Sequence, residues 1–306
     1  MNLPSSKAAW VEYGWGVVSV GVEDVPMDRA EIVRRLAGVL EDPDWRPPVL
    51  PEVAAQLIEL TRRPSVSLAE AAQLLTRDPT LAAQLMRRAN SATNVSTQRA
   101  QTVRDAAVRV GLLGLRNLAL EIALSAKVFQ AEGYQTTAEA LRRRSVATAY
   151  MTGVVCRHTN VPAAEAFLCA LLADVGLSVG LMVLGERTRG VKRPDLSLVW
   201  PSLVEIHAQF SARMATRWNL APETALVLAN HHQLCVDGQP HPMVAAVMVA
   251  EWLTDRLGVP FPSPPDATSV PRVSFEKQAR ETLGITDQRA EALLREGQKT
   301  LQELGY

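Results

Sequence analysis

The chain has 306 residues, 47% of them apolar, which is enough for one large domain or two ordinary ones. Its 32 Lys and Arg residues balance 32 Asp and Glu residues, and only 5% of the residues are aromatic. This composition offers no strong field for nucleic acid or anionic membranes and few side chains for base stacking. We therefore expect neither nucleic acid nor a membrane among its partners.

Residues 1–27 differ in character from the rest of the chain. Trp10, Tyr13 and Val18 stand there among several glycines, a pattern that predicts extended structure such as a short hairpin. Glu12 interrupts the apolar stretch, and a basic region is nearly absent, so the segment does not resemble a signal peptide. We treat residues 1–27 as an N-terminal extension.

Residues 28–136 contain a series of helix-start signals. Ser67 and Glu70 have the spacing of a capping box, and so do Thr102 and Asp105. The dipeptide Asp78-Pro79 combines a capping side chain with a residue that suits the first helical turn. The expected helices cover 28–40, 52–62, 79–90, the stretch from Thr102 to a stop at Gly111, and 115–130.

Two of these signals carry expected structural roles. Asp78 is expected to cap the helix that begins at Pro79. Asn90 and Ser91 are expected to help end that helix through side-chain hydrogen bonds to the local backbone.

Residues 137–306 also carry a helical pattern. Ser202 and Glu205 have capping-box spacing and predict a helix that ends near Asn219, and Pro222 lies near the start of the next one. A proline-rich loop around 260–271 precedes two short C-terminal helices. The fold class is therefore all-α. It has two packed helical subdomains, over 28–136 and 137–306, that divide near residues 131–145.

The apolar run Phe167–Gly185 raises the question of a membrane span. Asp174 lies near its centre, where a carboxylate in a bilayer costs about 3 kcal/mol. Glycines also interrupt the run, so a buried pair of helices is the better interpretation. The three cysteines lie in apolar stretches and fit no zinc or redox motif, so they indicate buried free thiols in a reducing cytoplasm: Cys156, Cys169 and Cys235.

Histidine is scarce, so its positions are informative. His207, His231 and His232 lie in or at the end of predicted helices, and Asp174 and Glu251 lie among apolar helical residues. Acids and imidazoles on separate helices can converge in a bundle core and bind a metal. A single helical histidine is, however, more often a surface residue or a satisfied core group. No local catalytic motif such as HExxH, a P-loop or GxSxG is present.

Several segments together resemble the HDOD family over roughly residues 45–255. Its members are all-helical bacterial proteins, regarded as regulatory relatives of the HD-type metal phosphohydrolases. The segments that carry the resemblance are Leu50-Pro51, Ser67–Glu70, Arg77–Ala82, Arg88–Ser91 and Val103–Leu115, followed by the later His231-His232 pair.

The resemblance also implies which residues occupy the positions of the HD metal ligands. Asp174 matches the Asp of the His-Asp pair, and the later histidines match His207 and His231 or His232. Glu251 stands where the family pattern has the final acid.

Two substitutions in this set decide the expected function. Ala173 replaces the His of the pair, and Arg144 stands where the first His is expected. Alanine has no lone pair, and a guanidinium is always charged and binds no metal. We therefore expect no bound metal, no cofactor and no catalysis. Arg144 is expected to pair with Asp174 in place of the metal, unless it continues the basic run Arg142–Arg144 on a solvated face.

The expected function is a non-catalytic regulatory role in a bacterial signalling circuit. Its partners are expected to be other signalling proteins, met in the cytoplasm. One alternative is a sensor that holds a nucleotide or another small phosphorylated ligand with Arg144 and the histidines as donors. The other alternative is a residual metal-dependent phosphohydrolase.

Overall fold

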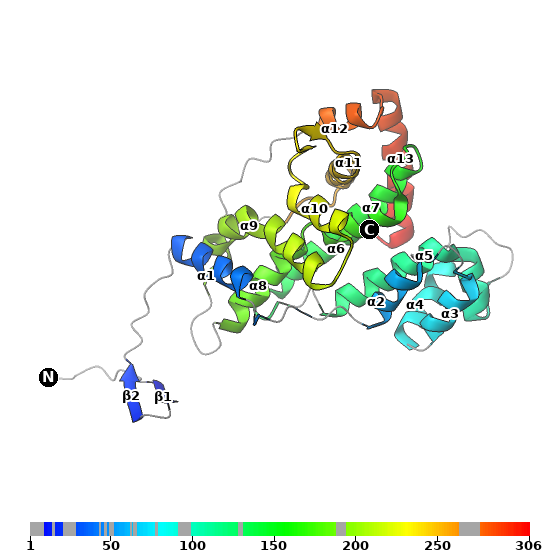
Figure 1. The fold of residues 1–306 in the computed structure, drawn as a ribbon. Coiled ribbons are helices and arrows are strands. Elements are labelled where there is room, and N and C mark those ends of the chain that lie inside the picture. The colour runs from blue at the N-terminus through cyan, green and yellow to red at the C-terminus, as the bar shows by residue number, and fades with distance from the viewer. Residues whose placement is uncertain are drawn as a thin grey trace.

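The computed structural model describes residues 9–13, 16–20, 29–42, 44–45, 48, 52–61, 63, 66–76, 79–90, 99–127, 131–187, 194–262 and 276–306. Across these residues the chain is all-α, as predicted, and its strands form only two small hairpins (Figure 1). The helices are α1 Arg29–Glu41, α2 Glu52–Thr61, α3 Leu68–Thr76, α4 Pro79–Ala89, α5 Val103–Lys127, α6 Gln135–Cys156, α7 Ala163–Leu172, α8 Val175–Arg187, α9 Leu196–Arg217, α10 Pro222–Asn230, α11 Pro242–Arg256, α12 Glu276–Thr282 and α13 Asp287–Leu304.

The two hairpins lie far apart in the sequence. Strands β1 (Ala9–Tyr13) and β2 (Gly16–Val20) pair antiparallel, which confirms the extended structure expected in the N-terminal extension. Strands β3 (Cys235–Val236) and β4 (Gln239–Pro240) form a second, very short hairpin between α10 and α11 that the sequence analysis did not foresee.

Helices α2 to α5 pack around a small core of their own. Alanine and leucine side chains of α3, α4 and α5 form it, among them Leu75, Leu85 and Leu115, all fully buried. Both predicted capping boxes are present here. The backbone N–H of Glu70 donates to Ser67 Oγ at 3.2 Å, and the N–H of Ser67 donates to the Glu70 carboxylate at 3.0 Å.

The second box and the predicted helix stop both lie in α5. Thr102 and Asp105 exchange the same pair of hydrogen bonds, at 3.0 and 3.1 Å. Gly111 does interrupt the helix, with φ of 73°, but a second helical stretch follows it directly, so α5 is kinked there. A positive φ suits glycine, which has no Cβ to clash.

The Asp-Pro and Asn-Ser signals are only partly described. Helix α4 begins at Pro79, as predicted, whereas Asp78 and Ser91 lie outside the described residues. Asn90 does not bond to the local backbone as expected. Its amide accepts from the N–H of Ala100 at 2.8 Å and donates to the Ala100 carbonyl at 3.1 Å, so it joins the end of α4 to the residues before α5.

A larger core lies among α6 to α11, and α13 packs on α6 and α11. Helix α1 was assigned to the first subdomain, but it packs against α9 and buries Ile32, Leu36 and Val39 in this larger core. Its apolar stripe therefore finds its partner about 170 residues away in sequence. Figure 1 shows α1 beside α8 and α9, apart from α2 to α5.

Helix α9 begins earlier than predicted. Asp195 caps it by accepting from the backbone N–H of Ser197 at 2.8 Å, and the helix continues through Pro201. Ser202, expected as the cap, is instead fully buried within the helix. The end of the helix is close to the prediction, since Asn219 follows it with φ of 53°.

The apolar run over α7 and α8 forms part of the core. Within the described residues, Ala163–Gly185 has the length and hydropathy of a membrane span, but 94% of its apolar 18-residue stretch is buried in the structure. Burial raises the pKa of the Cys156 thiol to about 11 and of the Cys169 thiol to about 12, so these two are inert buried thiols. Cys235 was expected to be buried too, but it is exposed on β3.

Candidate functional site: a histidine–aspartate cluster beside a buried arginine

Asp174 lies in the tight turn between α7 and α8, and its backbone is fixed by α9. The hydroxyl of Ser211 donates to the carbonyl of Ala173 at 2.7 Å and accepts from the N–H of Gly176 at 2.9 Å. A Cβ at Gly176 would lie 2.0 Å from the carbonyl oxygen of His207. Only glycine therefore lets the turn approach α9 this closely, which brings Asp174 to the level of His207.

Three imidazoles converge on the Asp174 carboxylate. His207 comes from α9, and His231 and His232 follow the last turn of α10. The Nε2 atom of His207 lies 3.2 Å from that of His231 and 2.9 Å from that of His232. Asp174 Oδ1 lies 3.4 Å from His207 Nε2 and 3.7 Å from His231 Nε2. The structure thus brings together four residues that the sequence analysis named.

The protonation of two of these rings follows from their other nitrogens. His207 Nδ1 lies 2.6 Å from the carbonyl oxygen of Val204, and His231 Nδ1 lies 2.7 Å from that of Leu228. A carbonyl can only accept, so the Nδ1 atoms carry the protons. In the neutral rings of His207 and His231 the Nε2 lone pairs then face each other, an arrangement that a metal ion, a proton or an Nε2–H donated by His232 makes favourable.

This donor set fits a single divalent metal ion. The four ligand atoms of Asp174, His207, His231 and His232 all lie within 4.8 Å of one another. Three imidazole nitrogens and one carboxylate oxygen suit zinc and similar metals, and a carbonyl that orients each Nδ1–H is a usual support for such ligands. The expectation of no metal rested on the replacement of two histidine ligands by Ala173 and Arg144, but the four remaining groups form a compact set without those histidines.

Arg144 lies on the other side of Asp174. Its Nε is 3.9 Å from Asp174 Oδ2, and the side chains are 1% and 6% exposed, so this arginine is not on a solvated face. Its Nη1 forms a closer ion pair with Asp255 of α11 and donates to the Val259 carbonyl at 2.8 Å. The ring of Phe261 lies 5.6 Å from the guanidinium carbon.

Asp255, the carboxylate closest to the Arg144 guanidinium, was not among the residues expected at this site, whereas Glu251 was. Glu251 lies one turn earlier on α11 and is not in the four-residue cluster. It acts on the cluster by its charge. Burial alone would lower the pKa of His231, but the Asp174 carboxylate, 3.7 Å from Nε2, and the negative charge of Glu251 outweigh it, and the pKa of His231 is raised. This shift favours a cation at the cluster.

The cluster is too deeply buried to admit an organic ligand. Asp174, His207 and His231 are 5%, 1% and 0% exposed, and only His232 is partly exposed. A nucleotide or another phosphorylated molecule would have to open the packing of α7, α9 and α10 to reach these groups. The burial therefore opposes the alternative of a sensor that holds such a ligand here.

An all-helical fold with a buried histidine–aspartate cluster defines a protein of the HD-related type, and comparison with known proteins makes this specific. The family model of the HDOD domain matches residues 48–234. The chain therefore belongs to the HDOD domain family, as the sequence resemblance indicated. No curated protein matches it.

Three solved structures share the fold. A protein of Shewanella amazonensis, provisionally named a metal-dependent phosphohydrolase, is 16% identical, with a TM-score of 0.65 over 88% of this chain and 99% of its own. An HDOD domain protein of unknown function from Geobacter sulfurreducens is 20% identical, with a TM-score of 0.65 over 90% and 96%. A provisionally named signal transduction protein of Marinobacter aquaeolei is 21% identical, with a TM-score of 0.64 over 92% and 66%.

Proposed function

We propose that this chain is a non-catalytic bacterial signalling protein that regulates its partners through protein–protein contacts in the cytoplasm. Its membership of the HDOD family supports a signalling role, and so does the name of the Marinobacter protein. The neutral net charge and the fold add no sign of a nucleic-acid partner.

The observation that carries the proposal is the position of Arg144. Its buried guanidinium lies between Asp174 and Asp255 and contacts both carboxylates. A guanidinium supplies fixed positive charge, but it cannot bind water as a metal does or lower the pKa of that water. Asp174, the carboxylate that would bind a catalytic metal, is therefore paired with a cation that cannot catalyse hydrolysis.

A metal ion in the histidine–aspartate cluster would not restore hydrolysis. Asp174, His207, His231 and His232 would hold it, and they supply four protein ligands. Four protein ligands complete the coordination of a structural zinc site, whereas catalytic sites keep one position open for water. A bound ion would polarise its ligands and brace α9 against α10, which is a structural role.

An assay of the full chain tests the absence of catalysis. The protein is stripped of metal, reloaded with Zn²⁺ or Mn²⁺, and incubated with bis(p-nitrophenyl) phosphate as a generic phosphodiester. We expect no release of nitrophenol above that of buffer with the same metal. Turnover that requires the loaded protein and disappears on chelation or in Asp174→Asn would establish the residual phosphohydrolase instead.

Capture from the native cytoplasm tests the regulatory role. The intact chain with a C-terminal tag is cross-linked in its own cells, and the bound proteins are quantified. We expect a partner at a fixed ratio to the tagged chain. If the chain is recovered alone at all cross-linker concentrations, the role in protein–protein contacts is wrong.

A further inference from the structure

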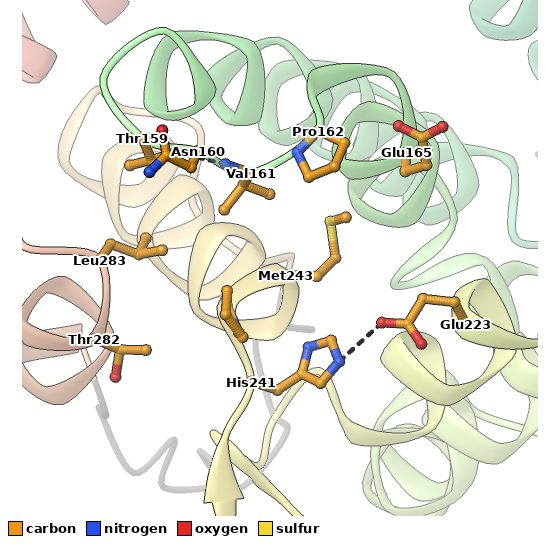
Figure 2. Close-up of a pocket in the computed structure, with 11 residues that line it drawn as sticks. Thr159, Asn160, Val161, Pro162, Glu165, Glu223, His241, Met243, Thr282 and Leu283 are labelled. Atoms are coloured by element: carbon orange, nitrogen blue, oxygen red, sulfur yellow. Dashed lines mark hydrogen bonds and ion pairs between the residues drawn. The ribbon is translucent and has the colours of Figure 1, made fainter.

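A cavity of about 590 Å³ lies outside the histidine–aspartate cluster. It is formed where the α6–α7 loop, the start of α10, the start of α11 and the end of α12 meet (Figure 2). This volume is in the range of pockets that bind small organic groups. One wall is apolar and consists of Val161, Pro162, Met243 and Leu283, with Met243 in the middle of the view.

Two carboxylates stand at the other end of this cavity. Glu165, on the first turn of α7, is exposed and has no ion-pair partner among the residues that the structure describes. Glu223, on the first turn of α10, is half exposed, and its carboxylate oxygen lies 2.9 Å from His241 Nε2. Figure 2 places both carboxylates on the same side of Met243.

His241 is the side chain beside Glu223 in the lining. It caps α11, because its Nδ1 accepts from the backbone N–H of Val244 at 3.4 Å. Its Nε2 faces the Glu223 carboxylate. The lining contains two carboxylates and no lysine or arginine.

The charges of Glu223 and Glu165 both act on the buried thiol of Cys169. Burial, and after it the charges of Glu223 and Glu165, raises the pKa of this thiol to about 12. Leu226, one turn after Glu223 on α10, is among the large apolar side chains that remain exposed.

We propose that this acidic groove, lined by the four apolar residues above and by Glu165, Glu223 and His241, binds an arginine side chain of a partner protein. The three-carbon stem of the arginine packs on Met243 and Pro162, and its guanidinium lies at the acidic end of the groove, where Glu165 and Glu223 stand. Long basic side chains bury their stems on apolar surface in this way, and a guanidinium forms charge-assisted hydrogen bonds with carboxylates. The proposal rests on the proposed role in protein–protein contacts and names the surface that makes one.

Methyl NMR of the full chain tests the groove directly, because the methyl group of Met243 lies in it. The probe is the peptide acetyl-Leu-Arg-Leu-amide, and its control is the same peptide with citrulline, which has the shape of arginine without the charge. We expect a saturable shift of the Met243 methyl signal with the arginine peptide. The signal of Met214, which is fully buried on α9, should not move. An equal response to the citrulline peptide, or no response to either, overturns the proposal.

Two double variants test whether the carboxylates of Glu165 and Glu223 bind the arginine peptide. In Glu165→Gln/Glu223→Gln the dissociation constant of the arginine peptide should rise at least tenfold. Glu41→Gln/Glu52→Gln removes the same net charge from exposed positions on α1 and α2, and it should bind as the natural chain does. An unchanged dissociation constant in the first variant contradicts the proposal, because the two carboxylates then take no part.

The same variants separate this inference from the proposed function. If cross-linking captures a partner equally with the natural chain and with Glu165→Gln/Glu223→Gln, the proposal that the groove binds the partner is wrong. The proposed regulatory role then stands. If the natural chain captures no partner, the regulatory role itself fails, whatever the peptide does. Loss of the partner in the first variant and its retention in Glu41→Gln/Glu52→Gln supports both.

Discussion

Arg144, on α6, and Asp174, in the turn between α7 and α8, meet in the core, with Nε of the first 3.9 Å from Oδ2 of the second. Asp255 holds the same guanidinium from α11, so one cation serves two carboxylates. This arrangement places positive charge beside a carboxylate that would be costly to bury alone.

Replacement of Arg144 by Ala is expected to lower the free energy of unfolding by about 3 kcal/mol, the usual effect of leaving a buried charge without its partner. Urea unfolding followed by circular dichroism measures it. The control is Arg256→Ala on α11, an exposed arginine, which should change stability by less than about 0.5 kcal/mol. Equal stabilities of the two variants would show that the buried pair contributes nothing.

Gly176 and Gly153 form a matched pair for the packing of the site. A Cβ at Gly176 meets the backbone of His207, which cannot move away, so Gly176→Ala should destabilise by about 3 kcal/mol or more. A Cβ at Gly153, inside α6, meets nothing within 4 Å, so Gly153→Ala should stabilise by about 0.5 to 1 kcal/mol. Thermal unfolding of both variants checks the signs. Two shifts in the same direction would contradict this account of the turn.

Asn90 should be a structural residue. Its side chain makes two hydrogen bonds to the backbone of Ala100, and both are lost in Asn90→Ala. At about 1 kcal/mol for each net bond, the variant should lose about 2 kcal/mol of stability. Hydrogen exchange should become faster at Ala100, while the amides of α13 keep their natural rates. Unchanged protection at Ala100 would mean that the two bonds do not hold this segment.

Glu296 predicts how stability changes at acid pH. Burial alone would raise its pKa, but hydrogen bonds from His158 and Arg157 outweigh burial, and the pKa lies below its ordinary value of 4.5. A lowered folded-state pKa stabilises the fold above pH 4.5, and this contribution is lost as the pH falls through the folded-state pKa. The Tm difference between the natural chain and Glu296→Gln should thus shrink below pH 4.5. A constant difference from pH 7 to pH 3 would show that these bonds do not act on Glu296.

The parts of this structure that the sequence predicted are those with local causes. Ser67 with Glu70, and Thr102 with Asp105, satisfy each other within one helical turn, so their spacing is enough. Ser202 with Glu205 has the same spacing but lies inside α9, because Asp195 caps the helix two turns earlier. A capping pattern alone does not distinguish the start of a helix from its interior.

The parts that the sequence could not predict depend on distant segments. The position of Asp255 beside Arg144 depends on how α11 crosses α6, and the two residues are 111 positions apart. The apolar stripe of α1 is visible in the sequence, but nothing local shows that it packs on α9. Family resemblance named the histidines of the cluster, and only the fold shows that their Nε2 atoms meet.

The cluster of Asp174, His207, His231 and His232 leads to the last prediction. We expect the metal-free chain to bind one Co²⁺ or Zn²⁺ ion, because the Nε2 lone pairs converge and the Nδ1 protons are already held by carbonyls. Titration with Co²⁺ should give the visible absorption of a tetrahedral site that saturates at one ion per chain. Metal at a hundred times its dissociation constant should stabilise the fold by about 2.7 kcal/mol, and a chelator should remove that gain. His231→Ala should abolish the absorption, while His241→Ala, outside the cluster, should keep it. A second tightly bound ion would contradict the view that Arg144 fills the remaining space. If no absorption appears at any Co²⁺ concentration, this prediction is wrong, and the expectation from the sequence that no metal binds is supported.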